Sequence, residues 1–316
     1  MLAVLTGTTP TDAARATHLH PDDLADAAER YRRAGQHALH HHRRPGWWQI
    51  NIEFTDWAGA ETVFAHHIAP LLDHTTDDPG PQWWFMRKHP CWRVRIPRRP
   101  GTAGHAPHHL TAGLDALVAE HLITDWRPAV YEPETTAFGG NTGMSIAHDL
   151  FCTDSRAITD LIRHHHIDLG RRELSVLLCT ALIRAAGAER YEQGDTWHRV
   201  ARERPLPTDV PAAKLTDLAH DLRHVIHADL SPDGPLLTEE GPLAAVASWV
   251  DGFRAAGHRL GSAARTGTLE RGQRDILSYL IIFHWNRLGL PTRSQSILAA
   301  AASTAIFDER TSSTTL

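Results

Sequence analysis

Cysteine is scarce in this sequence, which has three among 316 residues, at Cys91, Cys152 and Cys179. None belongs to a CxxC pair, so neither a disulfide framework nor a zinc ribbon is expected. No apolar run reaches about 18 residues, which argues against a membrane-spanning helix. The N-terminal stretch has neither a basic start nor a long apolar segment, so no secretion signal is expected. These absences predict a cytoplasmic protein without a membrane partner.

Charge of one sign is also lacking, because 32 basic residues stand against 37 acidic ones, a formal net charge of −5. Without a basic field, nucleic acid is not an expected partner. Histidine, by contrast, is abundant, with 24 residues and runs at 40–42 and 164–166. No HExxH motif or matched His/Asp cluster accompanies these runs, so we expect them on the surface and predict no metal site.

The first half of the chain mixes two hydrophobic periods. The segment "WWQINIEF" alternates between apolar and polar residues, which is typical of a half-buried strand. The same criteria predict further strands at 83–88, 92–96 and 126–132 and helices at 21–43, 57–73 and 108–122.

From about residue 144 nearly every segment has helical period. Asp154 and Ser155 are expected to cap the first of these helices, and Gly187 to close a buried one at 171–187. Further helices are predicted at 211–227, 242–258, 270–288 and 294–307. Because strands cluster early and helices late, we predict an α+β fold. Its mixed or antiparallel sheet would lie in the N-terminal half and pack with a largely α-helical C-terminal half.

The predicted hairpin around Lys88–Cys91 is rich in arginine. Arg93 and Arg95 share one strand face, and Arg87 is expected close by across the turn. Such arginines have two interpretations. They are either a solvated sheet face or a site that grips carboxylates and peptide carbonyls through the forked guanidinium.

The least generic stretch is "YEPETTAFGGNTGM" at 131–144. Its glycines permit positive φ and close backbone approach. Tyr131, Glu132 and Glu134 are candidates for acid–base chemistry or peptide anchoring. The alternative is that the segment is only a turn.

The late helix "IIFHWNRLGL" carries polar groups on an otherwise apolar stretch. His284 lies on its apolar face, Asn286 and Arg287 follow at once, and Tyr279 precedes His284 by about one turn. A buried histidine of this kind is either a satisfied core residue or part of a site, because buried polar groups need partners and are enriched in sites.

Three blocks, taken together, resemble a known family. "WWFMRKHPCWRVRIP" resembles a pattern W-F-x-R-Y-x-x-P-x-x-H-L-R-L-R, "YEPETTAFGG" followed by "FCTDS" resembles Y-E-P-E-x-x-R-Y-G-G with F-x-x-D-S, and "HWNRLGL" resembles a late N-R-L-G block. Their order is similar to that in the C-terminal elimination domain of class I lanthipeptide dehydratases and its stand-alone relatives in thiopeptide clusters. The resemblance extends from about residue 46 to 307. It implies one domain over 1–316, with an N-terminal helix at 1–45, a strand-rich part at 46–143 and a helical part at 144–316.

The chain departs from the glutamate-eliminating members of that family. Ala137 occupies the position at which those members resemble one another in having an arginine, which can hold the leaving glutamyl carboxylate. Phe138 occupies the position of the tyrosine that follows this arginine. Lys88 and Cys91 replace a tyrosine and a histidine in the arginine block. The "AFGG" form looks like the pyridine synthases of thiopeptide biosynthesis. These join two dehydroalanines by a formal aza-[4+2] cycloaddition and then lose water and the leader peptide. A glutamyl eliminase and a non-catalytic leader-binding partner are the alternatives.

The resemblance also implies roles for individual residues. No cofactor is implied, and the expected partner is a modified precursor peptide with an N-terminal leader, with other thiopeptide enzymes as further possible partners. An edge strand such as 47–54 or 83–88 would accept the leader by strand addition. The expected catalytic residues are Tyr131, Tyr279, His284 and Ser155. The expected substrate- and leader-binding residues are Arg87, Trp92, Arg93, Arg95, Glu132, Glu134, Asn286 and Arg287.

Overall fold

The computed structural model describes residues 9–43, 46–73, 82–98, 106–164 and 169–308. The chain divides into two compact units, with the boundary between Gly46 and Trp47. The first unit contains helices α2 (Pro10–Ala16) and α3 (Pro21–Arg43), the second of which matches the predicted helix at 21–43. The side chains of His40–His42 lie outside the described residues, as do His165 and His166, whereas His164 is exposed as expected.

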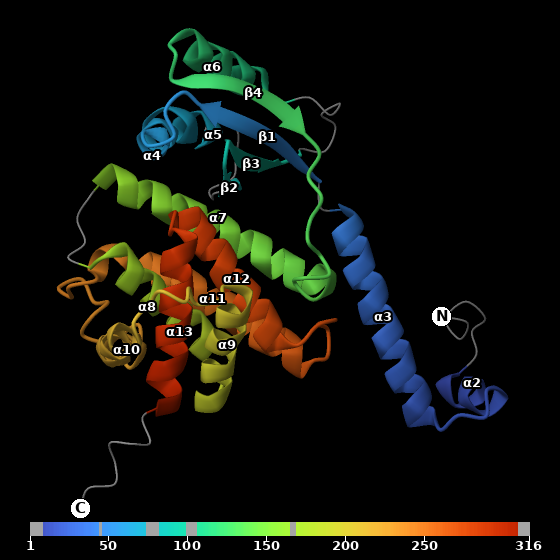
Figure 1. The fold of residues 1–316 in the computed structure, drawn as a ribbon. Helices are drawn as coiled ribbons and strands as arrows, with labels where there is room; N and C mark the ends of the chain where they lie inside the picture. The colour runs from blue at the N-terminus through green and yellow to red at the C-terminus, as the bar shows by residue number, and fades with distance from the viewer. Residues whose placement is uncertain (1–8, 44–45, 74–81, 99–105, 165–168, 309–316) are drawn as a thin grey trace, which may run out of the picture. The chain divides into compact units, whose positions relative to one another are not determined.

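The second unit begins with a four-stranded antiparallel sheet (Figure 1). Its order is β2–β3–β1–β4, so the predicted antiparallel sheet in the N-terminal half is confirmed. Because β1 is a central strand, the expectation that it could accept a leader at a free edge is wrong. The fourth strand begins three residues earlier than predicted and ends at Ala129. The strands are β1 (Trp47–Phe54), β2 (Trp84–Lys88), β3 (Cys91–Pro97) and β4 (Ile123–Ala129).

The apolar face of the sheet packs against a helical layer. Phe64 lies at the centre of this contact, with ring centroids 4.8 Å from Phe85 and 4.9 Å from Trp92. It belongs to a continuous helical segment that begins at Ala60 and contains one π turn. The segment therefore starts three residues later than predicted. The layer consists of α4 (Ala60–Val63), the π turn η1 (Phe64–Ile68), α5 (Ala69–Asp73) and α6 (His108–Ala119).

Strand β4 forms one edge of the sheet, and Pro128 lies in it. The orientation of Pro128 follows from the alternation of antiparallel hydrogen-bonded pairs. The amide of Phe85 points away from β3, toward Ser155, so its partner Val94 bonds toward Ile50 of β1. The backbone N–H and C=O of Ile50 then point toward β3 and away from β4. The backbone nitrogen of its partner Pro128 therefore faces away from β1, toward the outer edge of the sheet. Proline therefore removes a donor from the free edge of the sheet.

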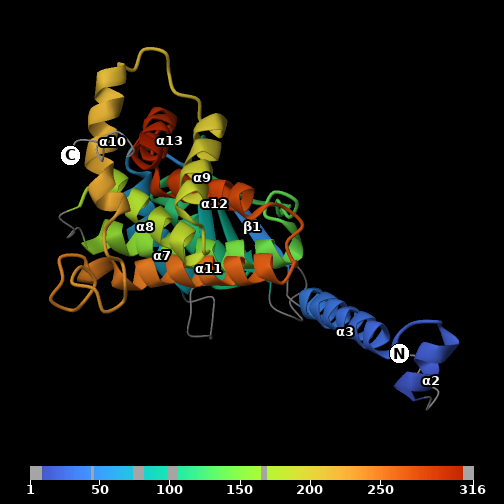
Figure 2. The same ribbon diagram turned by 90° about the horizontal axis from the view of Figure 1, so that it is seen from below.

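The rest of the second unit is helical. Two of its helices, α7 and α11, run side by side (Figure 2). The predicted helices at 171–187, 211–227, 270–288 and 294–307 are present to within a few residues, while the one expected at 242–258 begins later and extends further. Helix α9 was not predicted. The α+β class is thus confirmed. The helices are α7 (Gly140–His164), α8 (Arg171–Ala185), α9 (Arg190–Glu203), α10 (Ala212–Ile226), η2 (Ala244–Val246), α11 (Ala247–Arg265), α12 (Gln273–Leu288) and α13 (Thr292–Phe307).

Helix α7 begins at Gly140, so the prediction that Asp154 and Ser155 cap a helix is wrong. Glycines make the earlier start possible. Gly139 and Gly140 have φ of +76° and +86°, and a Cβ at Gly143 would lie 1.7 Å from the carbonyl oxygen of Phe138. No side chain fits at that distance, so the expectation of positive φ and close backbone approach is confirmed.

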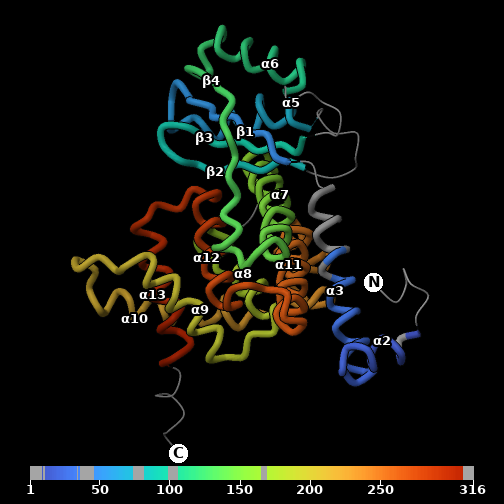
Figure 3. The backbone as a smooth tube through the Cα atoms, turned by 90° about the vertical axis from the view of Figure 1, so that its right-hand side faces the viewer, coloured from blue at the N-terminus to red at the C-terminus, as the bar shows by residue number. Residues whose placement is uncertain are grey.

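The sheet is anchored to the helices through its β2 edge. The amide of Phe85 donates a 3.1 Å hydrogen bond to Oγ of Ser155 in α7. Nε of Arg87 donates a 2.6 Å bond to the carbonyl oxygen of Arg287 in α12. The segment that follows β4 then runs down past β2 to the start of α7 (Figure 3). Among the described residues, no helix combines the length and apolarity needed to cross a membrane.

Candidate active site

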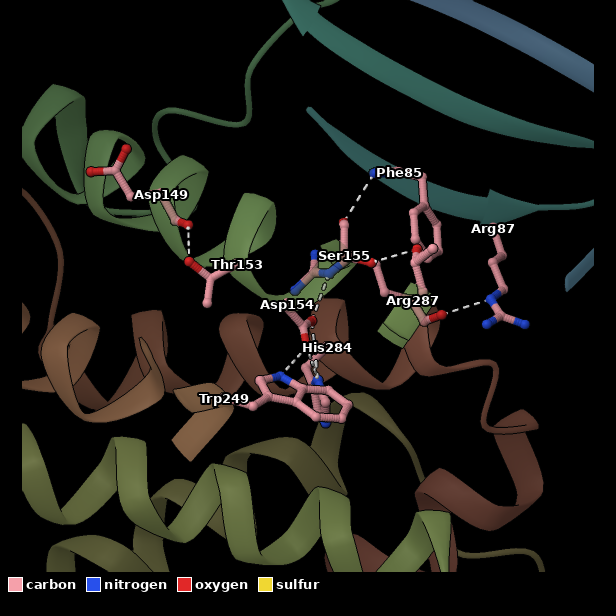
Figure 4. A network of polar contacts seen from close by, with 10 residues as sticks. Phe85, Arg87, Asp149, Thr153, Asp154, Ser155, Trp249, His284 and Arg287 are labelled. Carbon is pink, nitrogen blue, oxygen red and sulfur yellow. Dashed lines mark hydrogen bonds and ion pairs between the residues drawn. The ribbon is translucent and has the colours of Figure 1, made fainter. Parts of the chain in front are cut away.

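A fully buried polar cluster connects α7, α11 and α12 (Figure 4). Its centre is Asp154, whose carboxylate lies 2.9 Å from Nδ1 of His284 and 2.7 Å from Nε of Arg287. The indole nitrogen of Trp249 donates a third bond, of 3.0 Å, to the same carboxylate. Asp154, His284 and Arg287 are each 0% exposed. A buried carboxylate is stable only with such partners.

The charges of this cluster depend on one another. Burial raises the pKa of Asp154, but the neighbouring His284 and Arg287 outweigh it and hold that pKa below its usual value. Burial lowers the pKa of Arg287, and Asp154 opposes that shift. Within the described residues, Nε2 of His284 and both amino groups of Arg287 have no hydrogen-bond partner. The cluster therefore retains donor capacity that the surrounding protein does not use.

His284 has the geometry of an imidazole oriented by a carboxylate. Nδ1 faces Asp154, which leaves Nε2 as the atom available for proton exchange. Its ring packs edge-on against Phe253, with centroids 5.1 Å apart, and has no exposed surface. A peptide can reach Nε2 only if the side chains around this ring move.

A second cluster lies near the end of β4, on the sheet face opposite to the one that packs against Phe64. The β3 register pairs Arg95 with Trp84 of β2 and Gln49 of β1, so the three side chains share that face. Nε of Arg95 donates a 2.8 Å bond to Gln49, and its guanidinium lies 4.2 Å from the Trp84 ring centroid. Tyr131 lies two residues after the end of β4, and the same guanidinium is 5.2 Å from its ring centroid. Its hydroxyl lies 2.8 Å from Nε2 of His148 in α7.

The second cluster holds one phenol in its protonated form. Burial raises the pKa of Tyr131, Glu134 raises it further, and Arg95 only partly opposes them. Burial also lowers the pKa of Arg95 to about 10, against the opposing effects of Tyr131 and Glu134, so Arg95 remains charged at neutral pH. The site thus offers a phenolic proton donor beside a cation.

Aromatic rings connect the two clusters. Trp84, which carries Arg95 on one side, has its ring centroid 4.9 Å from that of Phe151. The guanidinium of Arg287 lies 4.3 Å from the Phe151 centroid. The cations of the two clusters are therefore linked through two aromatic side chains that contact each other at a tilt of 48°. Cations over such ring faces are attracted by the ring quadrupole.

Arg87 does not join Arg93 and Arg95, contrary to the prediction. The hairpin register pairs Arg87 with Trp92, which places it on the opposite face of the sheet. There it forms an ion pair with Glu61, which also binds Arg171 at 2.7 Å. The prediction failed because the turn pairs Lys88 with Cys91, so an odd-numbered residue of β2 shares its face with even-numbered residues of β3.

Three other predicted site residues have structural contacts instead. Trp92 is 1% exposed and packs within the apolar core. Asn286 faces α13, where its side-chain oxygen accepts a 3.0 Å bond from Gln295. Ser155 is 0% exposed and holds the amide of Phe85. These positions support packing and strand anchoring.

The remaining predicted residues lie nearer to solvent. Tyr279 is half-buried, with its ring 6.4 Å from Phe138 and the guanidinium of Arg271 4.9 Å from its centroid. Arg93 is half-buried, whereas Glu132 and Glu134 are exposed. Of the predicted site residues, the structure therefore brings Tyr131 and Arg95 together in the second cluster. It brings His284 and Arg287 together in the buried cluster around Asp154.

His148 was missed in the sequence. It lies three and seven residues before Phe151 and Ser155, the spacing of one helix face, and all three are buried. This period would have placed His148 toward the sheet, but the helix was expected to begin after it. No group of three His, Cys, Asp or Glu side chains within the described ranges is placed to hold a metal ion.

Comparison with known families places this fold. Residues 47–306 match the family described as the lantibiotic biosynthesis dehydratase C-terminus. The chain belongs to this family. The match begins at the first residue of the second unit, so the lantibiotic dehydratase C-terminal fold consists of the sheet and the helices built around it.

Three solved structures share the fold of this lantibiotic dehydratase C-terminal chain. The tRNA-dependent lantibiotic dehydratase MibB from Microbispora sp. 107891 has 20% identity and a TM-score of 0.60, covering 85% of this chain. The chain spans 28% of the length of MibB. TsrL has 17% identity and a TM-score of 0.58, covering 84% of this chain and 95% of its own. TbtD, the pyridine synthase from thiomuracin biosynthesis, has 14% identity and a TM-score of 0.58. The match covers 84% of this chain and 99% of the TbtD chain. Comparison with curated proteins gave no match.

Proposed function

We propose that this chain is a cofactor-independent pyridine synthase that cyclises a modified precursor peptide. Two dehydroalanines of one leader-bearing peptide would react in a formal aza-[4+2] cycloaddition. Loss of water and of the leader amide then leaves a six-membered nitrogen heterocycle and a closed macrocycle. The family membership and the shared fold of TbtD support this class of reaction.

The observation that carries the proposal is the side-chain chemistry between positions 131 and 138. Tyr131 supplies a protonated phenol beside the Arg95 cation, whereas the half-buried Ala137 supplies no charge. A glutamyl eliminase of this family would be expected to hold the leaving carboxylate with a cation at that position. A phenol beside a cation suits the activation of an amide carbonyl instead.

The chemistry requires one amide to reach its iminol form so that it can act as an azadiene. Tyr131 would give its proton to the carbonyl oxygen while Arg95 polarises the same group. A positioned acid of this kind contributes about 10²–10⁴-fold to a rate. Both alkenes belong to one chain, so holding them together supplies effective molarities of about 10⁵–10⁸ M. Glu132, Glu134 and the half-buried Arg93 would bind the peptide and its leader beside this site.

The buried cluster would act behind this site. Asp154 fixes the orientation of His284 and Arg287, and Arg287 faces the Phe151–Trp84 rings that border Arg95. Tyr279, at the Phe138 side of the same aromatic group, is the second candidate proton donor. The later losses of water and leader amide each need a proton transfer, for which Tyr279 and His284 are the proposed groups.

Mass spectrometry of the purified protein with a synthetic leader-bearing peptide containing two dehydroalanines tests the proposal. Loss of water together with release of an intact leader amide is the expected result. A glutamylated peptide that loses glutamate and yields dehydroalanine would instead identify an eliminase. An unchanged peptide that binds through its leader would identify a non-catalytic partner.

A further inference from the structure

His148 occupies the inner side of the Tyr131 site. It belongs to α7, is 8% exposed, and has its Nε2 atom 2.8 Å from the Tyr131 hydroxyl. The imidazole packs against two indoles, with its centroid 4.8 Å from that of Trp47 and 6.0 Å from that of Trp84, and these two indoles also contact each other. These contacts restrict rotation of the ring and keep Nε2 directed at the phenol.

The phenol needs such a partner if it acts as an acid. A buried tyrosine that loses its proton leaves a phenolate in an apolar surrounding, and Glu134 adds a second negative charge nearby. The Arg95 guanidinium lies over the Tyr131 ring, 5.2 Å from its centroid. His148 contacts the phenol oxygen itself, at 2.8 Å.

We propose that His148 is a positioning residue that orients the Tyr131 hydroxyl and restores its proton after transfer to the peptide. The assignment rests on the proposed function. The proton of the Tyr131 hydroxyl passes to the amide oxygen of the substrate, and the Nε2 proton of the His148 imidazolium passes to the Tyr131 oxygen, which leaves a neutral imidazole. The imidazole regains a proton from water when the product leaves. As the amide oxygen gains this proton, the amide nitrogen gives up its own to water, so the iminol forms without net proton uptake and both side chains return to their starting state.

Two substitutions separate proton transfer from orientation. His148→Phe keeps a flat ring against the two indoles but has no atom to bond the phenol. His148→Gln keeps a polar nitrogen near the position of Nε2 but cannot pass on a proton. His198→Gln is the matched control, because His198 is exposed on α9. Arg95 of β3, Glu134 of the 131–139 segment and Cys152 of α7, which also act on Tyr131, are unchanged in all variants.

The kinetic test uses the bis-dehydroalanine peptide across a range of pH. We expect both His148 variants to lower kcat at least tenfold, with KM within threefold of the parent and a changed kcat–pH profile. His198→Gln should leave all three unchanged. Restoration of kcat in His148→Gln would overturn proton transfer, because orientation alone would then suffice. A kcat within twofold of the parent in His148→Phe would overturn the whole assignment.

A second readout does not depend on turnover. Tyrosine is replaced by 3-fluorotyrosine in the full chain, and the Tyr131 resonance is identified by its absence in Tyr131→Phe. This resonance should respond to pH where histidines titrate, and the response should vanish in His148→Gln. If the parent protein does not cyclise the peptide, the proposed function fails, and a retained response still supports the His148–Tyr131 pair. A resonance that is equally flat in parent and variant would overturn the pair itself.

Discussion

Asp154 and Arg287 form an ion pair without any exposed surface, with 2.7 Å between Oδ2 and Nε. The two residues are 133 positions apart in the sequence, so the pair fixes α12 against α7. Desolvation of both charges offsets most of their attraction, and the net contribution of such a pair to stability is small. Removal of one partner is different, because the other charge then stays buried without compensation.

Asp154→Asn should therefore destabilise the fold by about 3–5 kcal/mol. Urea denaturation followed by circular dichroism measures this loss. Asp209→Asn is the control, since Asp209 pairs with Arg293 on the surface at 2.8 Å, where solvent screens the charges and removal of one should change stability little. The double variant Asp154→Leu/Arg287→Met should lose less stability than Asp154→Asn. A double variant that is less stable than the single would contradict this account.

Glu61 should make stability depend on pH in the acid range. Burial raises its pKa, but Arg171 and Arg87 outweigh that effect and lower the pKa from 4.5 to about 2 in the folded state. The unfolded chain thus binds the proton more tightly, so this contribution is fully present above about pH 4.5 and is lost as pH falls toward 2. It amounts to at most about 3 kcal/mol.

Urea denaturation between pH 2 and 6 measures the effect of Glu61. In Glu61→Gln, the part of the pH dependence that belongs to this group should disappear. Stability at pH 6 should also fall, because the buried Arg87 loses its partner. An unchanged slope of stability against pH in the variant would contradict the role assigned to Glu61.

Ser155→Ala should lower stability without abolishing turnover. The substitution leaves the buried amide of Phe85 without its acceptor, which costs about 1–3 kcal/mol. Peptide cyclisation by the folded fraction should stay within about threefold of the parent. Ser262→Ala on the exposed face of α11 is the matched control, with an expected change within about 0.5 kcal/mol. Complete loss of cyclisation at full folding would restore a catalytic role for Ser155.

Gly143→Ala should severely destabilise the second unit. Its Cβ would lie 1.7 Å from the Phe138 carbonyl oxygen, so either α7 or the preceding turn must shift. We expect a loss above about 3 kcal/mol, measured as the free energy of unfolding, because backbone strain belongs to the mechanisms that give large effects. Gly35→Ala in α3, where nothing lies within 4 Å, should instead stabilise its helix by up to about 1 kcal/mol.

Tyr131→Phe should reduce the rate of cyclisation by about 10²–10⁴-fold, because the ring remains and only the proton donor is lost. Initial rates by mass spectrometry, together with leader affinity by calorimetry, separate chemistry from binding. Tyr191→Phe is the control, since Tyr191 is 63% exposed on α9. A full rate in Tyr131→Phe would transfer the proposed role to Tyr279.

Local patterns in the sequence predicted the sheet well. Alternation identified β1 and both strands of the hairpin, and it correctly placed Arg93 and Arg95 on one face. The position of Arg87 depended on the pairing across the turn, which alternation within one strand does not contain. The partner of Arg87 is Glu61, 26 residues away, and no local signal indicates that ion pair.

The site was less predictable because its contacts are long-range. His284 was left open between core and site, and its carboxylate partner is 130 positions distant. Asp154 was interpreted as a helix cap because its sequence context suits one, yet the glycines at 139–143 allow α7 to begin 14 residues earlier. The same early start brings His148 to Tyr131, so one misplaced helix boundary concealed two partners of the site.

Pro128 has a consequence for how the chain behaves at high concentration. A second copy that approached the outer edge of β4 would meet a carbonyl-bearing residue without an amide hydrogen, and its own ladder would be interrupted there. The opposite edge, β2, is already bonded to Ser155. Growth of the sheet from one molecule to the next is therefore disfavoured at both ends.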